Sequence, residues 1–442
     1  MTLVATAPAR RGRLRLLAAR DFRLLWIGET TSSLGSSISV VALPLAALTL
    51  LHASVFAISV LTAAAWLPWL VVGLPAGAWV DRLPRRRIML TADLVSLTAF
   101  ASVPAAAALG WLTITQLLIV ALLSGTAAVF FATAYRAFLP ALLNTEDLPE
   151  GNAKLQGSEQ VTHVAGPGAA GLIAQATSAV GGVIADAASF AVSAACLSRI
   201  HVSEPPPTAP RRRLRSEIAE GLAIVARDPL LRMNAAFGCL ANLVLTGYQA
   251  GLVYYLVKVI GLSPGVTGVM LSLTSLGGVL GALAARRIAA RIGTARAVLL
   301  GKAGLAPFGL LIPLADRGPG LALFLLGSIA VIGGIVAGNV IWSGWVQAYY
   351  PARLLGRITT SVQVFNYGAI PAGAILAGLA ASHLGVRPTL WIMLTGLVLS
   401  SLVLLLGPLR TLRDLPSRQA PDTACAVDPH PLASVTQRDA ID

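Results

Sequence analysis

Four acidic residues lie inside long apolar stretches of the sequence, where a carboxylate needs a partner, a proton or water. They are Glu29, Asp93, Glu159 and Asp186. A charge at the centre of a bilayer costs at least about 2.5–3.5 kcal/mol on insertion scales. These residues are therefore candidates for carrying protons or for stabilising polar structure inside a membrane.

Two of the acids have polar neighbours at helical spacing. Glu159 and His163 are four residues apart, so their side chains can meet on a helix, and a histidine titrates near neutral pH. Glu29 starts a stripe that continues, at offsets of three, seven and ten residues, with Ser32, Ser36 and Ser39. We expect this stripe to border a water-filled cavity, and we predict proton coupling through Glu29, Glu159 and His163. The alternatives are hydroxyls bonded to carbonyls one turn back and a Glu159 that is merely hydrated near its helix end.

The second half of the sequence offers neutral polar and aromatic residues instead of acids. Helical spacing places them on shared faces: Asn242, Thr246 and Gln249; Asn339, Ser343 and Gln347, with Trp342 nearby; and Gln363, Asn366 and Tyr367. Any single one fits an interhelical hydrogen bond, worth about 0.6 kcal/mol in a membrane. Together, and with no embedded cation expected, they predict a cavity for a moderately apolar organic molecule that is neutral or cationic.

Motifs for catalysis and for cofactor or metal binding are missing. The sequence has no Gly-x-x-x-x-Gly-Lys-Ser/Thr phosphate loop, no His-Glu-x-x-His pair and no Gly-x-Ser-x-Gly elbow. Cys196, Cys239 and Cys425 lack the spacing of a metal site or a disulfide framework. We therefore expect neither an enzyme nor a bound cofactor or metal.

The elements that must position these residues are membrane-spanning helices. Charged residues form 12% of the chain and apolar residues 56%, whereas soluble domains carry about 25% charge. A helix needs about 20 apolar residues to cross a bilayer. We predict an all-α integral membrane protein with twelve transmembrane helices at residues 22–49, 54–80, 88–109, 113–138, 152–176, 180–199, 233–258, 263–289, 296–315, 320–348, 355–382 and 387–408.

Basic residues accumulate on alternate loops. Lysines and arginines exceed acids by 33 to 19, which gives a net charge of +14. Most arginines lie in the two terminal segments and in the loops after spans 2, 6, 8 and 10, whereas the opposite loops hold only Lys258, Arg317 and Arg387. The positive-inside rule then places both termini in the cytoplasm of a multi-pass cell-membrane protein. Topology and contact with lipid headgroups account for the basic excess, so we expect no nucleic-acid partner and no removable signal peptide.

The longest interior polar stretch divides the chain into two halves of six spans. We predict a basic cytoplasmic segment (1–21), an N-terminal six-helix bundle (22–200), a cytoplasmic linker with an amphipathic helix (201–232), a C-terminal six-helix bundle (233–409) and a disordered cytoplasmic tail (410–442). The halves repeat weakly, because the segment from Asp81 to Arg87 after span 2 recurs as Ala290 to Arg296 after span 8. Such pseudo-symmetric six-helix repeats are typical of transporters.

A loop motif carries a family resemblance. The segment Gly77-Ala-Trp-Val-Asp81-Arg82-Leu-Pro84-Arg85-Arg86 resembles the loop signature of the major facilitator superfamily, with Pro84 where glycine is usual. The stretches 135–140, 152–171 and 186–193 are similar to the macrolide-efflux and enterobactin-exporter group, and the resemblance covers about residues 20–410. It implies a transporter with helices 1, 4, 7 and 10 around a central cavity.

The resemblance also implies roles for single residues. Asp81, together with Gly77, Arg82, Arg85 and Arg86, would form a cytoplasmic gating loop whose carboxylate latches onto the N-terminus of span 11; the plain alternative is a solvated turn. Asp93 and Asp186 would lie on peripheral helices as structural, hydrogen-bonded acids. Glycines and prolines of spans 5 and 11 would form a kinked, tightly packed seam between the halves: Gly166, Pro167, Gly171, Pro371 and Gly373.

These observations predict a monomeric secondary transporter that exports a small organic compound in exchange for protons. The Gly-Pro element of span 5 is similar to one associated with export by antiport. Two alternatives stay open on the sequence, namely a proton-coupled importer of the same fold and a membrane receptor that does not transport its ligand.

Overall fold

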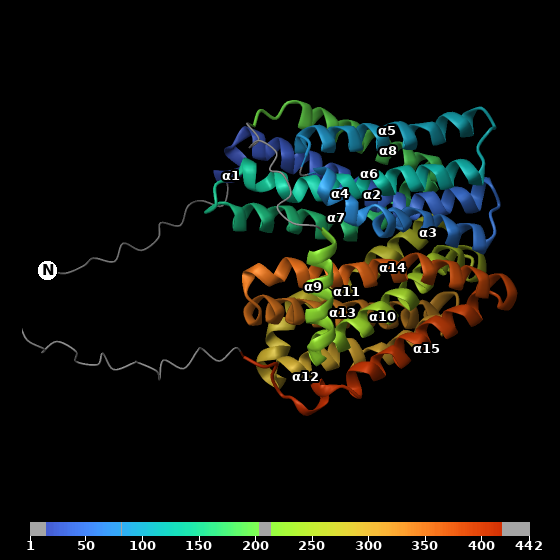
Figure 1. The fold of residues 1–442 in the computed structure, drawn as a ribbon. Coiled ribbons are helices and arrows are strands. Elements are labelled where there is room, and N and C mark those ends of the chain that lie inside the picture. Colours follow the sequence, from blue (N-terminus) through green and yellow to red (C-terminus); the bar gives the residue numbers. More distant parts are fainter. Residues whose placement is uncertain (1–14, 81, 203–213, 418–442) are drawn as a thin grey trace, which may run out of the picture.

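The computed structural model describes residues 15–80, 82–202 and 214–417, and in this part of the chain all regular elements are helices (Figure 1). Its first part contains α1 (Arg15–Ala18), α2 (Arg20–Leu50), α3 (Val55–Val71), α4 (Gly73–Val80), α5 (Arg85–Ala108), α6 (Ile114–Leu142), α7 (Leu148–Ala176) and α8 (Ala179–Ser198). The second part contains α9 (Leu214–Arg227), α10 (Pro229–Tyr254), α11 (Pro264–Ile292), α12 (Thr294–Leu299), α13 (Leu321–Tyr349), α14 (Ala352–Leu384) and α15 (Val386–Leu405). Short π-helical and 3₁₀ segments extend some of these: η1 (Tyr255–Val259), η2 (Leu300–Gly304), η3 (Ala306–Leu314), η4 (Gly318–Gly320) and η5 (Pro408–Thr411).

Ten helical segments in the described ranges are long and apolar enough to cross a membrane. Each coincides with one of the twelve stretches expected from the sequence. The other two expected spans are also helical but differ in kind: α3 is a shorter apolar helix, Val55–Val71, and α7 carries Glu150, Lys154 and Glu159. The sequence thus predicts the positions of the helices correctly, whereas the twelve-span count stays a prediction.

Two of the expected spans are not continuous α-helices. The second is interrupted at Val72, whose backbone N–H donates to the carbonyl of Pro68. Pro75, three residues further on, lacks the N–H that would bond to Val71, so the helix restarts as α4. The ninth changes from α12 through the π-helical η2 into the 3₁₀-helical η3, which carries Pro307 and Pro313.

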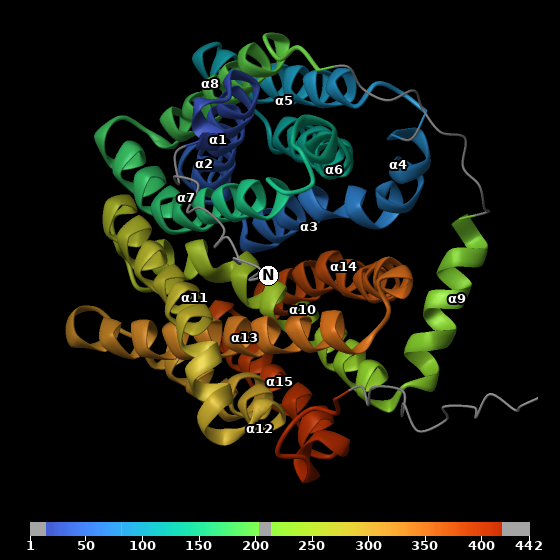
Figure 2. The same cartoon turned by 90° about the vertical axis from the view of Figure 1, so that its left-hand side faces the viewer.

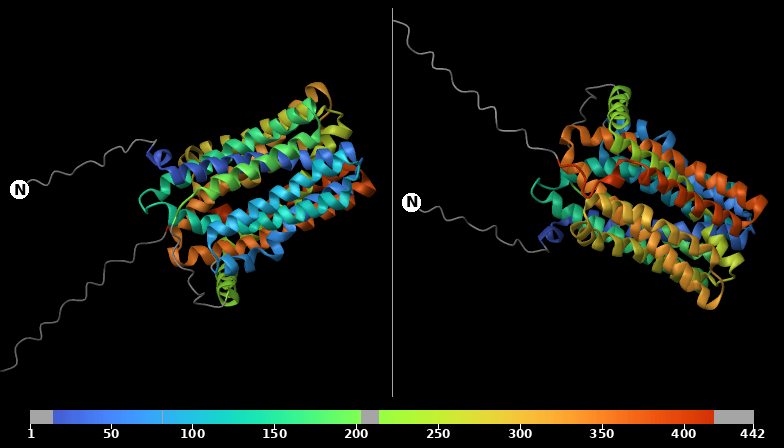
Figure 3. Two further views of the ribbon diagram at one scale, coloured as in Figure 1. Left: turned by 90° about the horizontal axis from the view of Figure 1, so that it is seen from above. Right: turned by 90° about the horizontal axis from the view of Figure 1, so that it is seen from below.

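The long helices form two groups that lie next to each other. Seen along the helices, α1–α8 make up one group and α10–α15 the other (Figure 2). The long helices run nearly parallel, and α9 lies across them beside the first and second groups (Figures 1 and 3). Gly221 of α9 lies against the carbonyl of Arg357 in α14, so this amphipathic helix is attached to the second group.

Buried apolar side chains form one large core at one end of the molecule and two cores at the other, and a small cluster of Ala63, Ala250 and Ala374 joins α3 to α10 and α14. We call the end where α2 begins and α15 finishes the terminal end, and the opposite end the far end. At the far end a single core combines residues of both groups, among them Leu45, Val103, Leu252 and Leu390. At the terminal end each group has its own core. The two groups are therefore joined at the far end and separate at the terminal end.

The segment after α15 packs onto the second group. The backbone N–H of Thr294 donates to Oδ1 of Asp414 at 2.8 Å, and the N–H of Leu415 donates to the Thr294 hydroxyl at 2.8 Å. Trp345 Nε1 donates to the carbonyl of Pro416 at 2.8 Å. Residues 410–417, which the sequence predicts as the start of a disordered tail, are thus ordered because they supply acceptors for the start of α12. Residues 418–442 lie outside the described ranges.

A second polar contact fixes the start of α10. Asp228 Oδ1 accepts from the backbone N–H groups of Leu230 and Leu231, as an N-cap residue does. Tyr350, in the loop after α13, donates its hydroxyl to the other oxygen of Asp228. Burial, and then this carboxylate, raise the pKa of Tyr350 above its usual range, so that it stays a donor at neutral pH.

Candidate functional site

Glu29 occupies the terminal half of α2. Its side chain is half-buried, and its Oε2 is buried without a hydrogen-bond partner. It interacts electrostatically with Asp93 of α5 and Glu159 of α7. Glu29, Asp93 and Glu159, which lie far apart in the sequence, are therefore neighbours within the first group.

Glu159 and His163 meet on α7, as their spacing predicts. His163 Nε2 lies 3.7 Å from Glu159 Oε1, and the two side chains are 58% and 56% exposed. The same stretch of α7 is tied to α2 by two bonds: Trp26 Nε1 donates to the hydroxyl of Ser158 at 2.8 Å, and the hydroxyls of Ser33 and Thr162 are 2.7 Å apart. The pair is thus an accessible, titratable site on a helix that is fixed to α2.

The serines of the stripe on α2 differ in their exposure. Ser36 is exposed, whereas Ser32 and Ser39 are buried at 9% and 5% exposure. Ser39 lies near Asp186 of α8, and its buried hydroxyl has no hydrogen-bond partner among the residues that the structure describes. Of the two serines proposed for the cavity, only Ser36 is accessible; close packing of α2 on α8, which Gly35 permits beside Ser189, covers Ser32 and Ser39.

Asp93 and Asp186 are deeply buried and bonded to hydroxyl groups. Asp93 is 2% exposed and hydrogen-bonds to Ser193 of α8. Asp186 is fully buried and accepts from the hydroxyl of Ser189 at 3.2 Å. One oxygen of each carboxylate has no partner in the described part of the chain. Their structural role stays a prediction.

The glycines of α7 lie in the contact between the two groups. Gly171 lies against the backbone of Gly268 in α11, and the backbone N–H of Gly168 donates to the hydroxyl of Ser272 at 2.8 Å. Gly166 faces Ser37 of α2 instead. The carbonyl of Pro167 lies beside Gly268, so the Gly-Pro element forms a close backbone seam with α11.

The corresponding residues of α14 are arranged differently. Gly373 lies against the carbonyl of Leu243 in α10 and thus packs within its own group, and Pro371 is buried. Gly378, not Gly373, meets Ser59 of α3 across the groups. A side chain introduced at Gly373 or Gly378 would collide with neighbouring atoms. Only Gly378 lies at the contact between the two groups.

Three aromatic side chains also meet across the groups. Trp69 of α3 and Tyr367 of α14 are in edge contact with ring centroids 5.3 Å apart, and Trp66 lies 6.0 Å from Tyr367. The sequence singles out Tyr367 but not the two tryptophans. Their positions could not be paired before the register between α3 and α14 was known.

The loop motif is only partly visible. Asp81 lies outside the described residues, so its predicted latch onto span 11 stays untested. Arg86 donates from Nε to the carbonyl of Leu197 at 2.7 Å and from Nη2 to that of Ser198. It thus satisfies carbonyls at the C-terminus of α8. Arg82 is exposed, Arg85 is half-buried, and the backbone at Gly77 has open space beside it.

The polar residues of the second group divide into accessible and covered ones. Asn339, Ser343 and Gln347 lie on an exposed face of α13, and Gln249 of α10 is exposed. Thr246 is half-buried. Asn242 donates to the carbonyl of Gly238 at 2.9 Å, and Asn366 lies beside Gly238 with its Oδ1 unpartnered. Trp342 is buried at 7% exposure.

Trp342 is covered because it contacts a cation that the sequence interpretation overlooked. Lys302, in η2, is 3% exposed, and its Nζ donates to Asn234 Oδ1 at 2.9 Å. The same nitrogen lies 5.5 Å from the ring centre of Phe237 and 5.8 Å from that of Trp342. The expectation that no cation is embedded among the helices is wrong. Lys302 lies within the expected span 296–315. It is visible in the sequence when the spans are searched for basic residues as well as for acidic ones.

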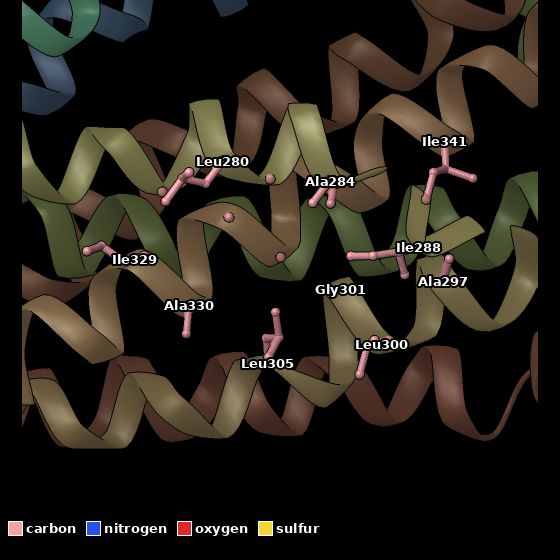
Figure 4. Close-up of a pocket in the computed structure, with 15 residues that line it drawn as sticks. Leu280, Ala284, Ile288, Ala297, Leu300, Gly301, Leu305, Ile329, Ala330 and Ile341 are labelled. Atoms are coloured by element: carbon pink, nitrogen blue, oxygen red, sulfur yellow. The ribbon is translucent and has the colours of Figure 1, made fainter. Parts of the chain in front are cut away.

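A cavity among α11, α12 and α13 is not part of this polar constellation (Figure 4). It is lined by the small and branched apolar residues Gly277, Leu280, Gly281, Ala284, Ile288, Ala297, Leu300, Gly301, Leu305, Ile329, Ala330, Gly333, Gly334, Ala337 and Ile341. No side chain in this lining can donate or accept a hydrogen bond, so nothing there would orient a polar ligand.

In the part of the chain that the structure describes, no group of three or more His, Cys, Asp or Glu side chains could hold a metal ion. Cys196 and Cys239 are both free. Acidic side chains come together around Glu29 in the first group, whereas Lys302 in the second group has the neutral neighbours Asn234, Phe237 and Trp342.

Comparison with known proteins was made for sequence and for structure. A family model described as transmembrane secretion effector matches residues 12–431. The multidrug efflux pump Tap of Mycolicibacterium fortuitum is 30% identical over 400 residues, which cover 87% of this chain and 93% of Tap. Macrolide efflux protein A of Streptococcus pyogenes is 24% identical over 408 residues, 89% of this chain and 97% of that protein.

Solved structures show the same fold at low sequence identity. The nucleoside transporter NupG superposes with a TM-score of 0.69 at 11% identity, over 87% of this chain and 98% of that one. A bacterial homologue of the iron transporter ferroportin in an inward-facing state has a TM-score of 0.68 at 16% identity, over 87% and 98% of the two chains.

Proposed function

This chain belongs to the transmembrane secretion effector family of major facilitator transporters, and we propose that it exports a small organic compound from the cytoplasm in exchange for protons. It is a multi-pass membrane transporter, and its family is one of transporters rather than enzymes, as the sequence predicts. The efflux direction is supported by the relatives, which are named as a multidrug efflux pump and a macrolide efflux protein.

The single observation that carries alternating access is the distribution of the apolar cores. One core joins both groups at the far end, and separate cores lie at the terminal end. Two rigid groups that share a core at one end and have separate cores at the other can rock about the contact between them. The close backbone seam between α7 and α11, at Gly171 and Gly268, lies in that contact.

The arginine distribution supports a cytoplasmic position for the terminal end. Arg86, Arg227, Arg291 and other arginines lie near helix ends on the terminal side, while the loops of the far end hold Lys258, Arg317 and Arg387. By the positive-inside rule both termini are then cytoplasmic. With α3–α4 and α7 counted as spans, the chain crosses the cell membrane twelve times as two six-helix bundles, and this conformation is open to the inside.

The proton pathway belongs to the first group. Glu29 has an unpartnered oxygen and lies close to Asp93 and Glu159, and His163 contacts Glu159. Protonation of one carboxylate relieves the repulsion between neighbouring acids. Because Glu159 and His163 are more than half exposed, they can exchange protons with water and pass them toward Glu29. The working unit is one monomer without a cofactor.

Everted membrane vesicles from cells that express the protein test this function. With an acid-inside pH gradient, they should accumulate a fluorescent drug, and collapse of the gradient with a protonophore should release it. Vesicles with the chain but without a gradient are the control. Accumulation that depends on the opposite gradient would indicate uptake, and binding without accumulation would indicate a receptor.

A further inference from the structure

Lys302 is a cation among neutral groups. Its ammonium group has three N–H donors, of which one donates to Asn234 Oδ1 at 2.9 Å. The rings of Phe237 and Trp342 lie within 6 Å of the nitrogen. In the ranges that the structure describes, no carboxylate forms an ion pair with it. The lysine is thus 97% buried with its charge compensated only by dipoles and aromatic faces.

The ammonium of Lys302 lies between α10 and α13, the two helices that carry polar faces in the second group. Lys302 belongs to η2, behind α10 and α13, and its side chain reaches between these two helices to Asn234 and Phe237 on one and Trp342 on the other. Gly338 of α13 makes room for it, because a side chain there would collide with the methylene groups of Lys302. α10 and α13 have few direct contacts with each other, so Lys302 bridges them.

The exposed polar face of α13 continues from this bridge. Ser343 follows Trp342 directly, and Asn339 lies one turn away; both are exposed. A molecule bound along this face would therefore lie next to the helix that covers the ammonium. The π-helical turn of η2, a local distortion that occurs often at functional sites, directs the lysine inward.

Charge balance then indicates the chemistry of the ligand. A buried ammonium that lacks a counter-ion is costly, and a carboxylate that accepts its free N–H donors removes this cost. We propose that Lys302 is the counter-charge for a carboxylate group of the transported compound, with Asn234, Phe237 and Trp342 holding the ammonium in place until the compound replaces Asn234 as the acceptor. This inference rests on the proposed export function and names its substrate class: organic molecules that carry a carboxylate.

The proposal differs from the sequence-based expectation of a neutral or cationic compound. The acids of the first group are compatible with a basic group on the transported compound. Lys302 of the second group would bind an acidic group of that compound. A compound and its methyl ester should therefore be distinguished by the protein, because the ester has the same body and lacks the negative charge.

Rhodamine B and its methyl ester form such a matched pair of fluorescent probes. Their binding to the purified full-length protein in lipid nanodiscs is measured by fluorescence polarisation at neutral pH. We expect the wild type to bind the acid about tenfold more tightly than the ester, which is the effect of one charge-assisted hydrogen bond. Lys302→Met keeps the length of the side chain without its charge, and should remove this preference while the affinity for the ester stays unchanged.

Lys258→Met, which removes a lysine of η1 at the far end of the molecule, is the matched control and should keep the preference for the acid. The measurement on the wild type does not depend on whether a variant folds. A wild type without preference for the acid, or a Lys302→Met variant that folds and keeps it, would overturn the inference. Export of the ester by everted vesicles would in that case still support the proposed function, whereas vesicles that accumulate no drug at all would refute that function separately.

Discussion

At the scale of single residues, the two groups of helices have opposite chemistry. The first group contains carboxylates that lie near one another around Glu29, and the second contains one buried ammonium, Lys302, that lies near aromatic rings. A transporter that couples two fluxes needs sites whose charge changes during the cycle. In our proposals the acids serve this purpose for protons, and the lysine for the transported compound.

Glu29→Gln should abolish coupling without disturbing the fold. The amide keeps the shape of the side chain but cannot take up a proton, so substrate-driven proton movement in proteoliposomes should fall to the level of empty vesicles. The measurement is the quenching of a pH-sensitive dye after substrate is added. Glu146→Gln, the same change at an exposed position before α7, is the control, and proton movement at the wild-type rate in Glu29→Gln would exclude Glu29 from the pathway.

Asp81→Asn tests the predicted latch of the cytoplasmic loop. If the carboxylate holds the N-terminus of α14 in the outward-open state, its neutral analogue loses the attraction of the helix dipole. Expression should be normal and drug export should be lost. Asp147→Asn, at the start of α7 where the side chain makes no capping bond, should export as the wild type does, and so would Asp81→Asn if the residue only belonged to a solvated turn.

At the scale of elements, backbone contact between glycines decides how closely α7 and α11 approach. Gly171→Leu adds four carbon atoms where the backbone of Gly268 already lies against the glycine. We expect a loss of stability of about 1–3 kcal/mol, typical of overpacking, together with a loss of transport. Thermal unfolding in detergent and drug efflux are measured on the same preparation.

Gly157→Leu is the control for this substitution, because it lies on the same helix and has open space beside its backbone. Both changes alter helix propensity equally, so a difference between them reports on the seam alone. Equal melting temperatures and equal transport of the two variants would contradict a close contact between α7 and α11.

The segment after α15 contributes to the stability of the second group. Asp414→Ala removes the acceptor for the backbone N–H of Thr294, and the loss of such a cap costs about 1 kcal/mol. Thr294→Ala removes the acceptor for the N–H of Leu415. Because both changes break one network, the double variant should lose less stability than the sum of the two single ones in thermal unfolding. Strict additivity would mean that the two residues act independently.

At the scale of the whole molecule, the proposed alternating access predicts that the contact at the far end and the separation at the terminal end belong to one state of a cycle. Spin labels on Arg82 and Gly356 report on the terminal end, and labels on Trp111 and Leu384 report on the far end; all four positions are exposed. The native cysteines are first replaced by serine. On addition of substrate and a pH gradient, the first distance should shorten and the second should lengthen.

Pulsed electron spin resonance in nanodiscs measures both distances. Opposite changes at the two ends are the signature of groups that rock about a central seam. Distances that change in the same direction, or not at all during turnover, would exclude alternating access by rigid groups.

The sequence determines the helices of this protein and the end of the molecule at which each begins. Apolar length and the placement of arginines predict these features because the bilayer imposes the same rule on every span. Contacts within one helix, such as that between Glu159 and His163, also follow from spacing alone.

Only the tertiary structure decides which faces meet. Ser32 and Ser36 belong to the same predicted stripe, yet one is covered by α8 and the other is accessible. Gly373 and Gly378 look equivalent along α14, but only Gly378 meets the other group. The register and rotation of neighbouring helices set these differences, and no local pattern encodes them. Lys302 shows this most clearly: its charge can be read in the sequence, but its neighbours on α10 and α13 come together only through packing.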